Sequence, residues 1–145
     1  MKKIVLGIAV LLSGLVNAQD IAADRVPSVV QNTFKQEFPN AYDVEWEFNG
    51  TSYTVEFEMG LFVDHEVVFS KTGDITQHIQ DVHRKDVPKA VIQTLKENYA
   101  GYSSDDFKRI ETGKDVSFFV ELDKFNDDRE VLLSEGGTVL SETQD

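Results

Sequence analysis

The chain repeats its own pattern, and this repetition restricts the fold more than any other feature of the sequence. Val26-Pro27 opens one apolar-periodic run and Val87-Pro88 opens a second, 61 residues further on. Three segments recur in the same order at nearly constant offsets, which predicts one structural unit used twice. They are Val26, Val30, Phe34 and Phe38 against Val87, Val91, Leu95 and Tyr99; YTVEFE (53–58) against FFVELD (118–123); and EVVFSKTGDI (66–75) against EVLLSEGGTV (130–139).

Each unit begins with a predicted amphipathic helix. Proline is tolerated at the start of a helix, and a four-residue apolar spacing places one stripe toward a core, so we expect helices over 27–38 and 88–99. The period then changes to two, which is typical of strands with one buried face. In the first unit we expect a hairpin over 44–59, turning at Asn49-Gly50, and a third strand over 65–70. In the second unit we expect strands over 107–110, 116–123 and 130–134.

The predicted fold class is therefore α+β, with two tandem helix-plus-antiparallel-meander units. Each unit has the order helix, strand, strand, strand, with room for a short fourth strand, and the helices pack on one side of the sheet or sheets. We place the first unit at 24–76, a polar linker at 77–86 and the second unit at 87–141. About 60 residues are marginal as an independent fold, so we expect the two units to form one structural domain.

The first 18 residues are typical of a secretory signal peptide. Lys2 and Lys3 precede an apolar stretch from Ile4 to Val16, and Ala18 ends a small-residue cleavage site. The stretch is shorter than the roughly 20 residues that span a membrane. We therefore expect a periplasmic or secreted protein with residues 1–18 removed and no membrane anchor after cleavage.

Charge and cysteine content exclude several functions. The formal net charge is −12, and loss of Lys2 and Lys3 with the signal peptide makes it −14. Nucleic-acid affinity comes mostly from Lys and Arg neutralising phosphates, so a nucleic-acid partner is not expected. The absence of cysteine excludes disulfides, thiolate zinc sites and thiol catalysis.

The first unit carries four motifs, namely Val26-Pro27, Phe38-Pro39-Asn40-Ala41, Val44-Glu45-Trp46-Glu47 and Tyr53-Thr54-Val55-Glu56-Phe57-Glu58. Together they resemble the pattern of the PepSY-like family, a group of beta-lactamase-inhibitor-like exported proteins. The resemblance covers residues 24–141. It implies a tandem fold with helices packed on an antiparallel sheet, and it implies no particular chemistry. The second unit departs from the pattern at Phe107-Lys108-Arg109-Ile110 and at the longer hairpin over 125–129.

Apolar residues on the solvent side of the predicted strands indicate a binding surface. If Phe118 and Val120 point to the core, Phe119 points away from it, and Val68 and Leu132 do the same on the third strands. Exposed apolar groups rimmed by carboxylates such as Glu56 and Glu121 are typical of a protein-binding patch. The alternative is that a second sheet or a terminal segment covers them.

An acidic group forms a second candidate site. On the outer face of the first hairpin the carboxylates could hold a hard cation such as Ca²⁺ or meet a basic partner, and otherwise they form a solvated acidic surface. No calcium-binding loop motif supports a specific site, so no metal and no cofactor are predicted. The weak metal-site candidates are Glu45, Glu47, Glu56 and Glu58.

Catalytic motifs are missing from the sequence. No GxSxG, HExxH, P-loop or GxGxxG pattern occurs. His78 and His83 are five residues apart, which is the wrong interval for zinc on one helix face, and His65 belongs to a predicted strand. We expect a non-enzymatic protein that binds a protein or peptide partner through an open sheet face. Inhibition or regulation of that partner is the effect that we consider. The alternative is a cation-binding or sensor-associated accessory protein that uses the acidic strands.

Overall fold

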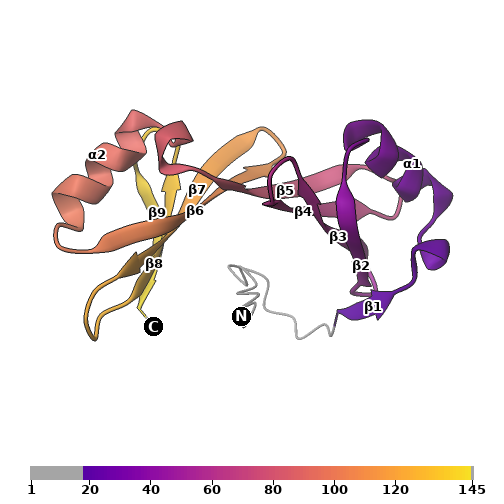
Figure 1. The fold of residues 1–145 in the computed structure, drawn as a ribbon, viewed down its shortest axis with the longest axis horizontal. Helices are drawn as coiled ribbons and strands as arrows, with labels where there is room; N and C mark the ends of the chain where they lie inside the picture. Colours follow the sequence, from indigo (N-terminus) through magenta and orange to yellow (C-terminus); the bar gives the residue numbers. More distant parts are fainter. Residues whose placement is uncertain (1–17, 145) are drawn as a thin grey trace.

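The computed structural model describes residues 18–144, in which nine strands and two ten-residue helices follow one another along the chain (Figure 1). The predicted signal peptide lies, apart from Ala18, outside the described residues. No helix within 18–144 is both long and apolar enough to cross a membrane. The elements are β1 (Gln19–Ile21), the short 3-10 helix η1 (Ala23–Arg25), α1 (Ser28–Glu37), β2 (Tyr42–Phe48), β3 (Ser52–Met59), β4 (Val63–Ser70), β5 (Ile75–Val82), the short 3-10 helix η2 (Arg84–Asp86), α2 (Lys89–Asn98), β6 (Ser103–Thr112), β7 (Asp115–Asp123), β8 (Arg129–Ser134) and β9 (Val139–Gln144).

All nine strands form one antiparallel sheet in simple sequence order, from β1 at one edge to β9 at the other. The predicted fold class, two tandem helix-plus-meander units, is therefore wrong. The sheet does not stop between the halves, because β5 pairs with β4 over residues such as Ile79 and with β6 over the facing Ile110. The molecule is mostly sheet, and the two short helices are additions to it.

The polar composition of β5 explains this error. The segment 77–86 was expected to be a linker, yet residues 77–82 belong to β5 and residues 84–86 form η2. Only Ile79 is buried in this strand, so apolar alternation is almost absent from its sequence. A central strand gains backbone hydrogen bonds from both neighbours, and these do not depend on side-chain hydropathy.

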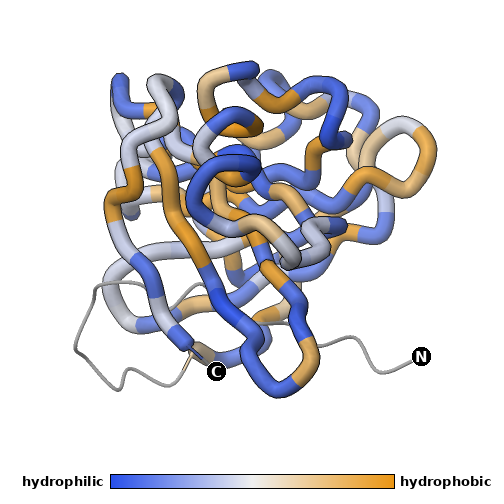
Figure 2. Tube along the Cα trace, turned by 90° about the vertical axis from the view of Figure 1, so that its left-hand side faces the viewer, coloured by the Kyte–Doolittle hydropathy of each residue, from blue (hydrophilic) through white to orange (hydrophobic). Residues whose placement is uncertain are grey.

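The helices lie where the sequence predicts them, each starting directly after its proline, Pro27 or Pro88. The apolar stripe of α1 packs on β2, β3 and β4, and the stripe of α2 packs on β6, β7 and β8. Figure 1 shows the helices at opposite ends of the molecule with the middle strands between them, and Figure 2 shows hydrophobic residues alternating with hydrophilic ones along the chain. The register across β5 and β6 shows that the residues beneath α1 and the residues beneath α2 lie on the same face of the sheet.

A glycine turn fixes each helix to the sheet. Gly137, between β8 and β9, has φ +84°, and a Cβ atom there would lie 2.5 Å from the carbonyl oxygen of Ala90 in α2. Thr94 donates a 2.6 Å hydrogen bond from Oγ1 to the Gly137 oxygen. Gly73, between β4 and β5, similarly approaches Val29 of α1. Only glycine allows both the positive φ and this close approach.

Candidate functional site

The face of the sheet opposite the helices carries the residues that the sequence predicts for binding, and we call it the open face. Strand residues alternate between the two faces, so Val55 and Phe57 lie under α1 while Glu56 lies on the open face. The register then places Phe119 and Leu132 opposite each other on β7 and β8 of this same face.

An apolar cluster occupies the middle of the open face. Ile79 and Ile110 pair across β5 and β6, and Phe119 joins them with Leu132 half-buried beside it. The exposed fractions of Ile79, Ile110 and Phe119 are 7%, 6% and 2%. We call these four residues the open-face cluster. It is separate from the two clusters that lie beneath the helices.

The predicted orientation of Phe119 is correct, but the exposure expected for its side chain is wrong. Its ring is buried because β5 and β6 continue the sheet beside β7 and bring two isoleucines against it. Val68, Leu132, Glu56 and Glu121 are all half-buried. The structure therefore brings Phe119 and Leu132 together, whereas Glu56 and Val68 lie on β3 and β4, on the far side of β5 and β6.

Carboxylates line up across the first strands of the open face. Glu45 of β2, Glu56 of β3 and Glu66 of β4 occupy successive paired positions, and Glu58 faces Asp64. Like charges in directly opposite positions repel each other. Burial, followed by the charges of Glu47, Glu45 and Asp64, raises the pKa of Glu56. Burial and then the charge of Glu56 raise the pKa of Glu66.

The second half of the open face repeats this excess of negative charge. Glu121 of β7 pairs with Glu130 of β8. Burial raises the pKa of Glu121 first, and the charges of Asp106 and Glu130 raise it further. Carboxylates with raised pKa values thus stand on both sides of the open-face cluster, which makes this surface favourable for an added positive charge.

Lys108 carries a positive charge that interacts favourably with several of these carboxylates. It pairs in register with Phe119, and its Nζ atom lies 3.5 Å from a carboxylate oxygen of Asp81. Its charge lowers the pKa values of Glu56, Glu66, Asp81 and Glu121, yet burial and like charges leave all four raised. One lysine is therefore too little to neutralise the face.

The weak metal-site candidates do not converge. Glu45 and Glu56 face each other, Glu47 faces Thr54, and Glu58 pairs with Tyr42 and Asp64. Among residues 18–144 no group of three or more His, Asp or Glu side chains is arranged to hold a metal ion.

A histidine pair on the helix face escaped the sequence prediction. His65 and His78 lie on the adjacent strands β4 and β5, with His65 Nδ1 3.0 Å from His78 Nε2. Phe57 stacks on His65, and Phe38 contacts His78 edge-on. His83 is exposed and does not join them. His65 and His78 are 13 residues apart in the sequence, and only the pairing of β4 with β5 brings them into contact. No local motif indicates that pairing.

These features define a class of protein: a single long antiparallel sheet with one helix-covered face and one acidic, partly apolar face. Within that class the chain belongs to the PepSY-like, beta-lactamase-inhibitor-like family, whose model matches it twice, over residues 15–77 and 51–141. The predicted family is thereby confirmed. No match was found among curated proteins.

Solved structures from Bacteroides share this fold. A DUF2874 family protein of Bacteroides uniformis has a TM-score of 0.71 and 20% identity, covering 81% of this chain and 88% of its own. A BLIP-like protein of Bacteroides fragilis has a TM-score of 0.69 and 23% identity, covering 81% and 85%. A Bacteroides eggerthii protein, provisionally assigned to the periplasm, has a TM-score of 0.74 and 18% identity, covering 82% and 88%. The periplasmic location expected from the sequence agrees with that assignment.

Proposed function

We propose that this protein is an exported, non-enzymatic binding protein whose open face captures a protein or peptide partner with basic and apolar side chains. The observation that carries the proposal is the open-face cluster flanked on both sides by carboxylates with raised pKa values, such as Glu66 and Glu121. A partner's Lys or Arg would lower those pKa values and remove repulsion that the isolated protein retains.

The residues of this face have different proposed roles, according to their burial and charge. Phe119 is too buried to contact a partner over much of its surface, so it forms the floor of the site. Val68 and Leu132 are half-buried and offer apolar contact on either side of that floor. Glu56 and Glu121 would orient the partner, because charge around an interface selects partners and speeds encounter more than it adds affinity.

Family and location support this function in general terms. The family is described as beta-lactamase-inhibitor-like, and the Bacteroides fragilis relative as BLIP-like. The Bacteroides eggerthii relative is provisionally periplasmic, in keeping with the signal peptide predicted over residues 1–18. We propose a periplasmic or secreted partner, with inhibition or regulation as the consequence of binding.

A charge-matched pair of variants tests the proposal. The exported protein is used as bait in an envelope extract and its partner is identified by mass spectrometry. The double variant Glu56→Gln/Glu121→Gln should capture much less of that partner. The control Glu37→Gln/Glu135→Gln removes the same charge from exposed positions on α1 and the β8–β9 turn, and it should capture the partner normally. Equal capture by both double variants would overturn the proposal.

The cation-binding alternative has its own test. The raised pKa values of Glu56 and Glu66 favour it, because a bound cation would offset the repulsion that contributes to them. Millimolar Ca²⁺ would raise the melting temperature under this alternative, and the rise would disappear in Glu56→Gln. Our main proposal predicts the same melting temperature with and without Ca²⁺.

A further inference from the structure

A basic pocket lies beside α2, away from the open face, in this otherwise acidic protein. A cavity of 230 Å³ is lined by Arg84, Lys96, Tyr99, Tyr102 and Ser104 with neighbouring apolar residues. A second cavity, of 330 Å³, shares Arg84 and Lys96 with the first. The other residues lining it are Lys85, Val87, Lys89, Ile92 and Gln93. We call the two cavities together the α2 pocket.

Positive charge is concentrated around this pocket. The segment 84–96 contains four cations, namely Arg84, Lys85, Lys89 and Lys96, and one carboxylate, Asp86, so its formal charge is +3. Within residues 18–144, none of these four cations lies within ion-pair distance of a carboxylate. The basic side chains that do form ion pairs, Lys108, Arg109 and Arg129, belong to strands.

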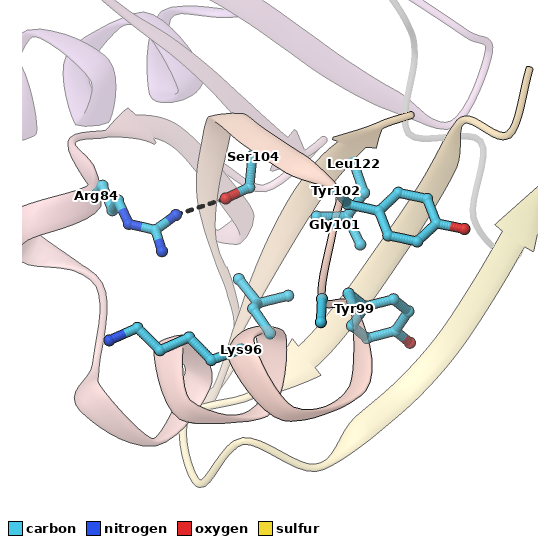
Figure 3. A pocket seen from close by; sticks show the side chains of 9 residues that line it. Arg84, Lys96, Tyr99, Gly101, Tyr102, Ser104 and Leu122 are labelled. Carbon is cyan, nitrogen blue, oxygen red and sulfur yellow. Dashed lines mark hydrogen bonds between the residues drawn. The ribbon is translucent and has the colours of Figure 1, made fainter. Parts of the chain in front are cut away.

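Two contacts hold the Arg84 side chain at this pocket. Arg84 Nη1 donates a 2.5 Å hydrogen bond to Ser104 Oγ, and its guanidinium carbon lies 5.6 Å from the centre of the Phe107 ring. Figure 3 shows Arg84 and Lys96 reaching to the same side of the pocket, while the phenol groups of Tyr99 and Tyr102 point the other way. The tyrosine hydroxyls are occupied there by Glu142 and Asp127. The cationic side of the first cavity therefore consists of Arg84 and Lys96, which are also the two cations that line both cavities.

In the corresponding corner of the first half, a glutamine side chain ties the short 3-10 helix to the longer helix. η1 and α1 precede η2 and α2 by 61 residues, so Gln31 corresponds to Ile92. Gln31 Nε2 donates hydrogen bonds of 2.5 Å to the Ala23 oxygen and 3.0 Å to the Val26 oxygen, which ties η1 to α1. Ile92 has no such donor and lines the open pocket instead.

Charge also differs between these two corners. Ala23 and Asp24 stand where the second half has Arg84 and Lys85, and Ser28 stands where it has Lys89. The segment 23–35 carries two cations and one carboxylate, a formal charge of +1. Only Lys35 matches its counterpart, Lys96, and it therefore provides a natural control.

We propose that the α2 pocket binds an oxyanion, the carboxylate or phosphate group of a small molecule, between Arg84 and Lys96. A guanidinium presents paired N–H donors that fit both groups, and a lysine ammonium adds a second charge. The second cavity, at 330 Å³, lies at the lower end of the range of about 300 to 1,000 Å³ for drug-sized pockets, and the first, at 230 Å³, lies below it, so the pocket suits only a small ligand. This site is separate from the open face, and either one can fail without the other.

The test is an NMR titration of the ¹⁵N-labelled protein at constant ionic strength. Inorganic phosphate is the probe in one arm and succinate in the other, so the arms distinguish phosphate from carboxylate. We expect saturable shifts of the Gly101 and Ser104 amide signals in at least one arm. Arg84→Gln and Lys96→Gln should each weaken that binding at least tenfold, and Lys35→Gln should leave it unchanged.

Arg84→Lys separates geometry from charge. The variant keeps the positive charge and loses the paired N–H donors of the guanidinium. Its affinity for the oxyanion should therefore fall, but by less than the affinity of Arg84→Gln. The exposed positions of Arg84, Lys96 and Lys35 make loss of folding unexpected, and the undisturbed amide spectrum of each variant checks this. Shifts that never saturate in either arm would overturn the proposal. So would a loss of affinity in Lys35→Gln as large as that in Arg84→Gln and Lys96→Gln.

Discussion

His65 Nδ1 lies 3.0 Å from His78 Nε2, so the two imidazole rings share a hydrogen bond between the strands β4 and β5. One ring must donate and the other accept, which requires at least one of them to be neutral. Burial lowers the pKa of His65, and the nearby Asp64 opposes this shift. Burial, then His65 and then Arg109 lower the pKa of His78 to about 4.

The histidine pair should make folding sensitive to mild acid. Below pH 6.5 the unfolded chain binds a proton at His78, whereas the folded chain does not until about pH 4, so this contribution to stability is lost as pH falls through that interval. Carboxylates with raised pKa values, such as Glu66, have the opposite slope. His78→Gln leaves them in place and isolates the histidine effect.

Urea unfolding at pH 7 and pH 5 measures that effect. The loss of unfolding free energy between the two pH values should be smaller in His78→Gln than in the unchanged protein by about 1 kcal/mol, a figure reduced because the ring is only half-buried. His83→Gln is the control, since His83 is exposed and outside the pair. An unchanged pH dependence in His78→Gln would contradict the assignment.

Gly137→Ala should destabilise the protein by about 1–3 kcal/mol. The new methyl group would lie 2.5 Å from the Ala90 oxygen, and φ at Gly137 is +84°. The neighbouring Gly136 provides a matched control, because a Cβ atom there would meet only Ser134 Oγ, at 3.8 Å. Chemical denaturation of both variants measures the difference. Equal effects would show that the turn does not clamp α2.

Phe119→Ala should cost about 3–5 kcal/mol of unfolding free energy, the usual range for a buried phenylalanine. Phe119 is 2% exposed within the open-face cluster, whereas Phe125, in the β7–β8 turn, is 93% exposed. Phe125→Ala should therefore change stability by no more than about 0.5 kcal/mol. A small effect of Phe119→Ala would place this side chain outside the core and return it to the partner-contacting surface.

Local patterns predicted the helices and the direction of side chains but not how the sheet is joined. The four-residue stripe beginning at Val26 indicated α1, and the alternation around Phe118 correctly placed Phe119 on the other face. The pairing of β5 with β6 depends on backbone hydrogen bonds over a strand in which only Ile79 is buried. The predicted fold class is therefore wrong, and the sequence does not show that β5 and β6 are the strands that bury Phe119.

The candidate site shows the same division. Alternation alone placed Glu56 and Val68 on opposite sides of their strands from the core, and the register confirms that orientation. The α2 pocket lies at a corner where the first half has Gln31, which is hydrogen-bonded to η1, and the second half has Ile92, which lines the pocket. Such a difference becomes informative only when the short helices η1 and η2 have been located.

Site-specific photo-crosslinking in the native envelope tests the role of the open face most directly. A benzophenone amino acid replaces Val68 or Leu132, the half-buried apolar residues of this face, or the exposed Gln36 on α1 as the control. We expect both open-face probes to form an adduct with the same protein partner and the Gln36 probe to form none. An adduct from Gln36 alone, or no adduct from either open-face probe while a partner is still captured, would contradict recognition through the open face.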